Sequence, residues 1–219
     1  MPSFNLELAR KNMILQQIRP WDVLNQRVLD VMSEVPRERF VPAGMEQLAF
    51  SDVELPLGVD EYMMAPKIEA RLLQALNLVG QEQVLEIGTG SAFLTACLAR
   101  LAAQVDSVEI HESLKLAAEQ RLDAVGVANV RIHLGDGAHG WGSDEYDAIA
   151  VTGSLPEYDP CFERALKPGG RLFVVVGRAP AMEAWLVTRI AERRYDRTSL
   201  FETQLKALIG REPKPTFVF

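Results

Sequence analysis

Cysteine is scarce in this sequence, and its scarcity excludes one class of protein. Only Cys97 and Cys161 occur among 219 residues, both in apolar segments that look helical, and two thiols do not form a disulfide framework. A reducing compartment fits this usage. The first residues lack a basic stretch followed by an apolar run, and no apolar run approaches the ~20 residues that span a bilayer. We therefore expect a cytoplasmic protein.

An excess of basic residues is absent as well. The formal net charge is -7 at pH 7, which argues against a protein that binds nucleic acid by neutralising phosphates. The basic cluster RIAERRYDR at 189–197 is predicted to be a solvated helix face. The three histidines, His111, His133 and His139, have neither ligand-like spacing nor cysteine partners, so no metal site is predicted. We expect neither nucleic acid nor a membrane as a partner.

Hydrophobic residues, in contrast, are plentiful. They make up 48% of the chain and charged residues 24%, as in soluble globular proteins, so one main folded domain is predicted. Helical spacing runs from about residue 5 to 50 and is broken by Pro36 and Pro42. A short strand is predicted at 51–58, followed by a helix that begins at Pro66 and ends near Gly80.

From residue 83 onward, strand-like and helix-like segments alternate. The strand-like runs are QVLEIG, QVDSVEI, VRIHLGD, YDAIAVTG and GRLFVVVG, and the helical ones include FLTACLARLA, SLKLAAEQRLDAVG and a stretch near 160–167. This alternation predicts an α/β fold with a doubly wound, mostly parallel sheet and helices on both faces. FETQLKALIG and PTFVF at the end are predicted to be further strands, an antiparallel pair at one sheet edge.

A glycine-containing loop follows the first of these strands. It reads EIGTGSAF, with Gly88 and Gly90 before a helix, where glycine permits a tight turn and the helix N-terminus offers amide donors. The dinucleotide pattern G-x-G-x-x-G would need a small residue at the position of Phe93, but the small residue is Ala92. The pattern E-x-G-x-G-x-A, which starts at Glu86, is typical of S-adenosylmethionine binding rather than NAD binding.

Acidic residues end three neighbouring strands. Glu86 stands in the first strand, Glu109 ends the second, and Asp136 follows the third. Since the carboxyl ends of parallel strands share one edge, Glu109 is placed to accept hydrogen bonds from ribose hydroxyls, and Asp136 from an adenine amino group. The alternative, a set of unrelated surface or capping acids, does not account for three strand ends in register.

Several segments, taken in order, resemble one enzyme family. VPRERFVP, LPLG with a later proline, VLEIGTGSAF, VDSVEI, GDG, YDAIAVTG and LKPGGRLFVVVG are similar to the protein-L-isoaspartate O-methyltransferase family, across nearly the whole chain. VPRERFVP is the more family-specific piece, whereas the motif around Gly88 is shared by methyltransferases generally. The resemblance implies the Rossmann-like methyltransferase fold with S-adenosyl-L-methionine as the cofactor.

The resemblance also implies a reaction. The family transfers a methyl group from S-adenosylmethionine to the free carboxylate of an isoaspartyl residue, which starts the repair of damaged proteins. A carboxylate with a reference pKa near ~4 is ionised at pH 7, so no general base is needed, and catalysis is mostly in-line placement with water excluded. The lack of a Ser-His-Asp or Cys-His arrangement is therefore no objection.

The sequence departs from the family at residues 60–66, which read DEYMMAP. The family typically carries a G-Q-T-I-S-x-P segment there, whose hydroxyls help to hold the substrate carboxylate, but Tyr62 replaces the threonine and Met64 the serine. Losing a hydroxyl donor to an anion removes a hydrogen bond worth ~1.5–3 kcal/mol, and the two acids that precede Tyr62 repel a carboxylate further. Met63 and Met64 either pack against an apolar substrate group or are ordinary core residues.

The predicted site has a substrate part and a cofactor part. Tyr62, Met64 and Ser154 are the candidates for substrate contact, although Ser154 and its neighbour Thr152 are equally explained as turn residues. The ring of Tyr62 is suited to face the sulfonium, and Trp141 either flanks the adenine or covers the core. The residues predicted to bind the cofactor are Glu86, Gly88, Thr89, Gly90, Ser91, Glu109, Ile110, Asp136, Gly137 and Met63.

These observations lead to one main prediction and several rivals. Residues 1–60 are predicted to be a helical lead-in and short strand packed on the core, and residues 61–219 an S-adenosylmethionine-binding core. The expected acceptor is a protein or peptide with an isoaspartyl residue, or an unidentified small molecule. The rivals are a divergent methyltransferase with another acceptor and a family member that binds the cofactor without turnover. An NAD-dependent oxidoreductase is a more distant alternative.

Overall fold

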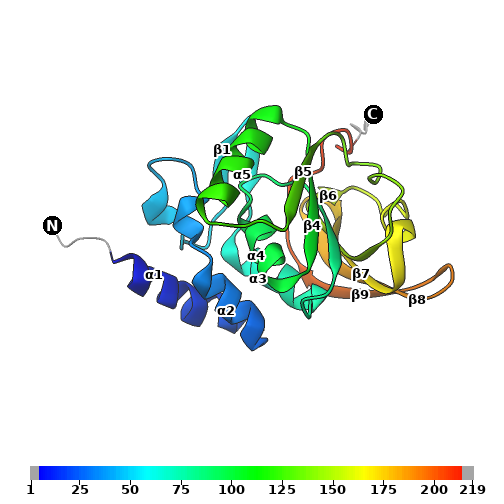
Figure 1. The fold of residues 1–219 in the computed structure, drawn as a ribbon. Helices are drawn as coiled ribbons and strands as arrows, with labels where there is room; N and C mark the ends of the chain where they lie inside the picture. Colours follow the sequence, from blue (N-terminus) through cyan, green and yellow to red (C-terminus); the bar gives the residue numbers. More distant parts are fainter. Residues whose placement is uncertain (1–4, 214–219) are drawn as a thin grey trace, which may run out of the picture.

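The centre of the molecule is a seven-stranded sheet in the order β5-β4-β3-β6-β7-β8-β9 (Figure 1). The structure is a computed structural model that describes residues 5–213. From β3 the chain adds β4 and β5 on one side and then β6 and β7 on the other, all parallel, before β8 and β9 complete one edge as an antiparallel hairpin. The strands are β3 (Gln83–Ile87), β4 (Gln104–Glu109), β5 (Val130–Leu134), β6 (Tyr146–Leu155), β7 (Leu166–Arg178), β8 (Ala181–Ala191) and β9 (Arg194–Glu202).

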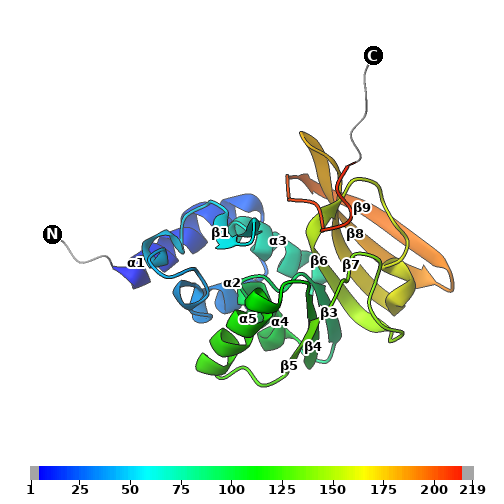
Figure 2. The same cartoon turned by 90° about the horizontal axis from the view of Figure 1, so that it is seen from above.

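The α-helices lie on one side of this sheet, and α3, α4 and α5 contact its strands (Figure 2). They are α1 (Leu6–Asn12), α2 (Gln26–Glu34), α3 (Pro66–Leu76), α4 (Phe93–Leu101) and α5 (Glu112–Ala124). Buried residues of α2 to α5 form one hydrophobic cluster with strand residues such as Val84, Val105 and Phe173. Met13 and Ile18, from the π-helical stretch that follows α1, belong to the same cluster. The N-terminal region and the sheet therefore share a core.

The other face of the sheet carries no α-helix within residues 5–213, although helices were expected on both faces. The connections after β5 and β6 cover it instead. The helix expected near 160–167 is only a 3-10 turn, Glu163–Ala165. β7 begins at Leu166, which pairs with Tyr146, so only six residues remain from Pro160, fewer than two helical turns.

The prediction of a helix face at 189–197 is wrong, because these residues belong to the hairpin of β8 and β9. β8 pairs with β7 from Arg178↔Ala181 to Arg171↔Thr188, and this long ladder outweighs the local helical pattern. An antiparallel pair does form the sheet edge, but residues 181–202 make it. FETQLKALIG only begins in β9 and then runs back across the sheet as a loop, and PTFVF lies outside the described residues.

Two short strands form a separate hairpin beside the main sheet. β1 (Leu55–Gly58) pairs antiparallel with β2 (Glu61–Met63). A strand was expected over 51–58, and β1 occupies only the second half of that range. Short 3-10 turns lie at Arg19–Trp21, Arg37–Arg39 and Glu46–Leu48. In the part of the chain that the structure describes, no helix is long and apolar enough to cross a membrane.

Candidate active site

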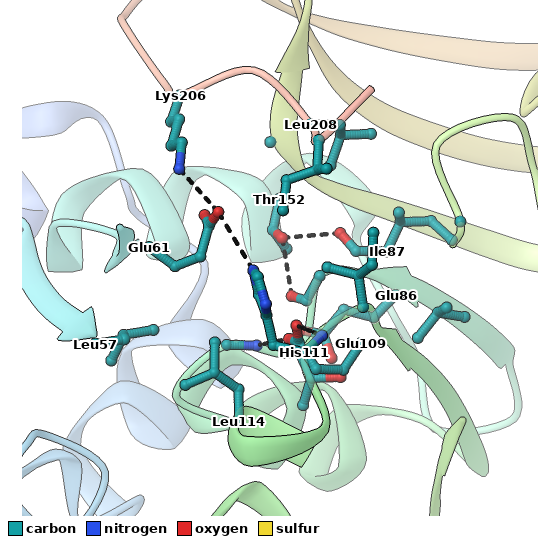
Figure 3. Close-up of a pocket in the computed structure, with 18 of the residues that line it drawn as sticks. Leu57, Glu61, Glu86, Ile87, Glu109, His111, Leu114, Thr152, Lys206 and Leu208 are labelled. Carbon is teal, nitrogen blue, oxygen red and sulfur yellow. Dashed lines mark hydrogen bonds and ion pairs between the residues drawn. The ribbon is translucent and has the colours of Figure 1, made fainter. Parts of the chain in front are cut away.

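A cavity opens at the carboxyl ends of β3, β4 and β6, where the chain reverses its direction of growth along the sheet (Figure 3). Open α/β sheets bind their ligands at such a switch point. Its walls come from the end of β3 and the loop after it (86–91), the end of β4 and the residues after it (108–111), 135–138 after β5, 152–153 of β6, β2 with the residue that follows it (61–64), and 205–209 after β9. The structure thus gathers segments that are distant in the sequence around one ligand-sized space.

Every residue predicted to bind the cofactor lies in the wall of this cavity. They are Glu86, Gly88, Thr89, Gly90, Ser91, Glu109, Ile110, Asp136, Gly137 and Met63. Tyr62 and Met64 line it as well, but Ser154 does not. The arrangement follows from the topology, since parallel strands bring their carboxyl ends to one edge.

The loop after β3 depends on glycine at one position in particular. Gly88 has φ +97, and a Cβ there would lie 2.2 Å from the Thr152 hydroxyl oxygen. That hydroxyl lies 2.8 Å from the carbonyl oxygens of both Ile87 and Gly88 and holds the loop in place. Only glycine fits both the left-handed backbone and this close approach.

Glu109 connects two walls of the cavity. Its buried carboxylate accepts hydrogen bonds from Gly90 N at 2.8 Å and from His111 N at 2.9 Å, one on each oxygen. Each carboxylate oxygen can accept further bonds, so the group is able to bind hydroxyl donors without releasing the loops.

Asp136 caps its own turn, with Oδ1 accepting from Ala138 N at 2.9 Å. Trp141 packs against the backbone of Gly135, where a Cβ would approach its ring to 2.5 Å, and against the His133 ring at 5.5 Å between centroids. Trp141 is therefore placed behind the wall that carries Asp136 rather than in the cavity wall itself.

Glu86 differs from the other two strand acids because it is fully buried. Its Oε2 accepts from the hydroxyls of Thr95 at 2.6 Å and Ser107 at 2.5 Å, whereas Oε1 has no partner. Burial raises the pKa of Glu86 to about 8, the charges of Glu109 and Glu69 add to the rise, and the two hydroxyls oppose it. Near neutral pH this side chain is mostly protonated.

We expect Glu86→Gln to remove part of the pH dependence of stability. A carboxyl with pKa 4.5 when unfolded and about 8 when folded retains a proton on folding, so the stability it contributes is present below about pH 4.5 and is lost as the pH rises to about 8. At roughly 1.4 kcal/mol per pH unit, the variant should gain roughly 3 kcal/mol relative to the parent between about pH 5 and pH 8. Urea unfolding of both proteins at the two pH values measures this, and parallel pH profiles would contradict it.

The segment DEYMMAP is anchored from beneath by the motif VPRERFVP. Arg37 is buried, and its Nη2 donates to the Met64 carbonyl at 2.7 Å while its Nε donates to the Ala49 carbonyl at 2.8 Å. Nη1 forms an ion pair with buried Glu69 of α3. Met63 and Met64 are buried in the hydrophobic core, and both also line the cavity. They are therefore core residues and pocket residues at once.

Sequence reasoning missed the segment at 205–209 and misplaced one hydroxyl. Ser154 is buried, and its hydroxyl donates to the Leu205 carbonyl at 2.8 Å instead of pointing into the cavity. The backbone of Ser154 also bonds to Lys206 and Leu208, which brings this segment over the cavity. Neither periodicity nor a motif marks these residues as part of a site. Among residues 5–213, no group of three or more His, Cys, Asp or Glu side chains could hold a metal ion.

Known proteins resemble this chain along most of its length. The family model of Protein-L-isoaspartate(D-aspartate) O-methyltransferase (PCMT) matches residues 9–208. A protein-L-isoaspartate O-methyltransferase of Syntrophus aciditrophicus (strain SB) is 43% identical over 184 residues, which cover 84% of this chain and 84% of the relative. One of Brucella anthropi is 34% identical over 213 residues, which cover 96% and 98%.

Solved structures extend the likeness to the fold. A Plasmodium falciparum protein solved in complex with S-adenosyl-L-homocysteine matches with a TM-score of 0.78 at 16% identity, over 93% of this chain and 98% of that one. The match confirms the predicted α/β fold of the Rossmann-like methyltransferase type.

Proposed function

Because this chain belongs to the protein-L-isoaspartate O-methyltransferase family, as its motifs predicted, we propose that it transfers a methyl group from S-adenosyl-L-methionine to the free carboxylate of an isoaspartyl residue in a protein or peptide. One observation carries the proposal: the residues expected around the cofactor all line a single cavity at the switch point of the sheet. The acceptor site then lies beside it, at the segment DEYMMAP.

The donor groups in the cavity fit this cofactor. Glu109 would hold the ribose hydroxyls, since its oxygens have acceptor capacity left beyond Gly90 N and His111 N. Asp136 would accept from the adenine amino group, and the loop from Gly88 to Gly90 lines the cavity beside it. When bound, the cofactor supplies an electrophilic methyl group on a sulfonium.

The residues of the chain orient the acceptor and exclude water. A carboxylate acceptor is already ionised at neutral pH, so no side chain has to remove a proton. Met63 and Met64 present an apolar wall, which keeps water from the reacting atoms and strengthens electrostatic contacts there. The contribution of the protein is therefore placement of the acceptor against the cofactor.

Methyl transfer from labelled S-adenosylmethionine to an isoaspartyl peptide, beside its normal aspartyl twin, tests the proposal. We expect label in the isoaspartyl peptide alone. The two peptides differ only in the position of the free carboxylate, and the reaction depends on placing that carboxylate against the cofactor. Binding of the cofactor is measured first by calorimetry, so that a negative result refers to the acceptor. Cofactor binding without transfer to either peptide would refute the proposed acceptor.

A further inference from the structure

An ion-pair cluster stands at the mouth of the cavity and joins three segments (Figure 3). Lys206 Nζ lies 2.9 Å from Glu61 Oε1, 3.0 Å from Asp60 Oδ2 and 2.5 Å from the Asp60 carbonyl oxygen. The same Glu61 oxygen lies 3.7 Å from His111 Nε2. The Glu61 carboxylate is therefore placed between a lysine from the 205–209 segment and a histidine from the end of β4.

His111 is not satisfied by this arrangement. Its Nε2 is buried and has no hydrogen-bond partner, because 3.7 Å to Glu61 is too long for a hydrogen bond. Buried polar atoms are normally paired, so an orphaned nitrogen in a cavity wall calls for a ligand that approaches more closely. An incoming oxygen acceptor between Lys206 and His111 would satisfy both groups.

The turn that carries Glu61 is strained and held from outside. Val59 and Asp60 have φ +48 and +60, a left-handed backbone that a β-branched valine strongly disfavours. Both contacts of Asp60 to Lys206 hold this turn against the 205–209 segment. Backbone strain of this kind clusters at ligand clamps and switch regions.

We propose that Glu61 is an internal stand-in for the substrate carboxylate, and that the acceptor carboxylate binds by displacing it from the place between Lys206 and His111. Lys206 is then the residue that selects a carboxylate, the role left open by Tyr62 and Met64 in place of hydroxyl residues. The inference rests on the proposed function. It also explains why two acids can stand at the entrance for an anionic substrate: Lys206 compensates them until the substrate arrives.

Two substitutions with opposite effects test the proposal. Glu61→Gln removes the competing charge, so KM for the isoaspartyl peptide should fall by about threefold or more, as expected when a competing state is removed. Lys206→Met removes the cation, so KM should rise by about tenfold, the size of one charge-assisted hydrogen bond. The dissociation constant of the cofactor should stay the same in both variants. Lys167→Met, which breaks a partly exposed pair with Asp147 away from the cavity, is the matched control.

A neutral twin of the substrate separates charge recognition from an indirect effect on shape. The same peptide with an amide in place of the isoaspartyl carboxylate is used as a competitive inhibitor, and its inhibition constant should be equal in the parent and in Lys206→Met. If Lys206→Met weakens the amide peptide as much, or if Glu61→Gln leaves KM unchanged or raises it, the inference is overturned while the proposed function stands. If the parent transfers no methyl group, the proposed function fails and the inference with it.

Discussion

Replacement of Arg37 by alanine is expected to lower the free energy of unfolding by about 3–5 kcal/mol, the range for breaking one side of a buried ion pair. Arg37 and Glu69 are 1% and 2% exposed, so alanine leaves a carboxyl group in the core without its cation. The carbonyls of Ala49 and Met64 lose their donors at the same time. The substitution also removes the guanidinium that lies over the Phe93 ring, with its carbon 4.5 Å from the ring centroid. The loss of this cation–π contact adds to the cost.

Urea unfolding measures this effect, and Arg39→Ala is its matched control. Arg39 lies in the same 3-10 turn but is exposed, so its substitution should change stability by less than about 0.5 kcal/mol. Burial already raises the pKa of Glu69 to about 7, against the opposing effect of Arg37. Without Arg37 this pKa rises further, and since a raised pKa makes stability fall with rising pH, the deficit should grow above about pH 7. A deficit below about 1 kcal/mol would contradict the expectation.

Glu109→Ala is expected to weaken the binding of S-adenosylmethionine by at least about tenfold, since hydrogen bonds to a charged group contribute ~1.5–3 kcal/mol each. The change removes the proposed acceptor of the ribose hydroxyls. It also releases Gly90 N and His111 N, which loosens two loops of the cavity. Both effects act in the same direction.

Calorimetric titration with the cofactor measures the change, and a melting curve confirms that the variant is folded. Glu112→Ala is the control, because Glu112 is an exposed carboxylate three residues away that lies outside the cavity wall. Its substitution should leave affinity within about twofold, as for surface sites in general. Unchanged affinity in Glu109→Ala would remove Glu109 from the binding site.

The cofactor side of the cavity could be predicted from the sequence because topology alone places it. Once strands and helices alternate, the residues after each parallel strand must meet at one edge, whatever their side chains do. Glu109 and Asp136 were identified in this way, and the cavity contains both. The depth of Glu86 could not be predicted in this way, because its contacts to Thr95 and Ser107 depend on the exact packing of α4 against β4.

The acceptor side was harder to predict because its geometry depends on irregular backbone and long-range contacts. Thr152 and Ser154 are two residues apart and would share a face in a regular strand. The pairing of β6 with β7 is irregular between Ala150 and Ser154, so Thr152 faces the cavity while Ser154 is buried against Leu205. Lys206 approaches Glu61 from the far end of the chain, and nothing local in either segment indicates that contact.

The two backbone bonds of Ser154 give the molecule a built-in reporter. Its N–H donates to the Lys206 carbonyl at 2.9 Å, and its carbonyl accepts from Leu208 N at 3.0 Å. If the 205–209 segment lifted from β6, the amides of Ser154 and Leu208 would lose protection from hydrogen–deuterium exchange, while amides in the centre of β3 would stay protected. The exchange rates of these two amides would therefore report whether this segment moves in the unaltered protein, without a label or a substitution.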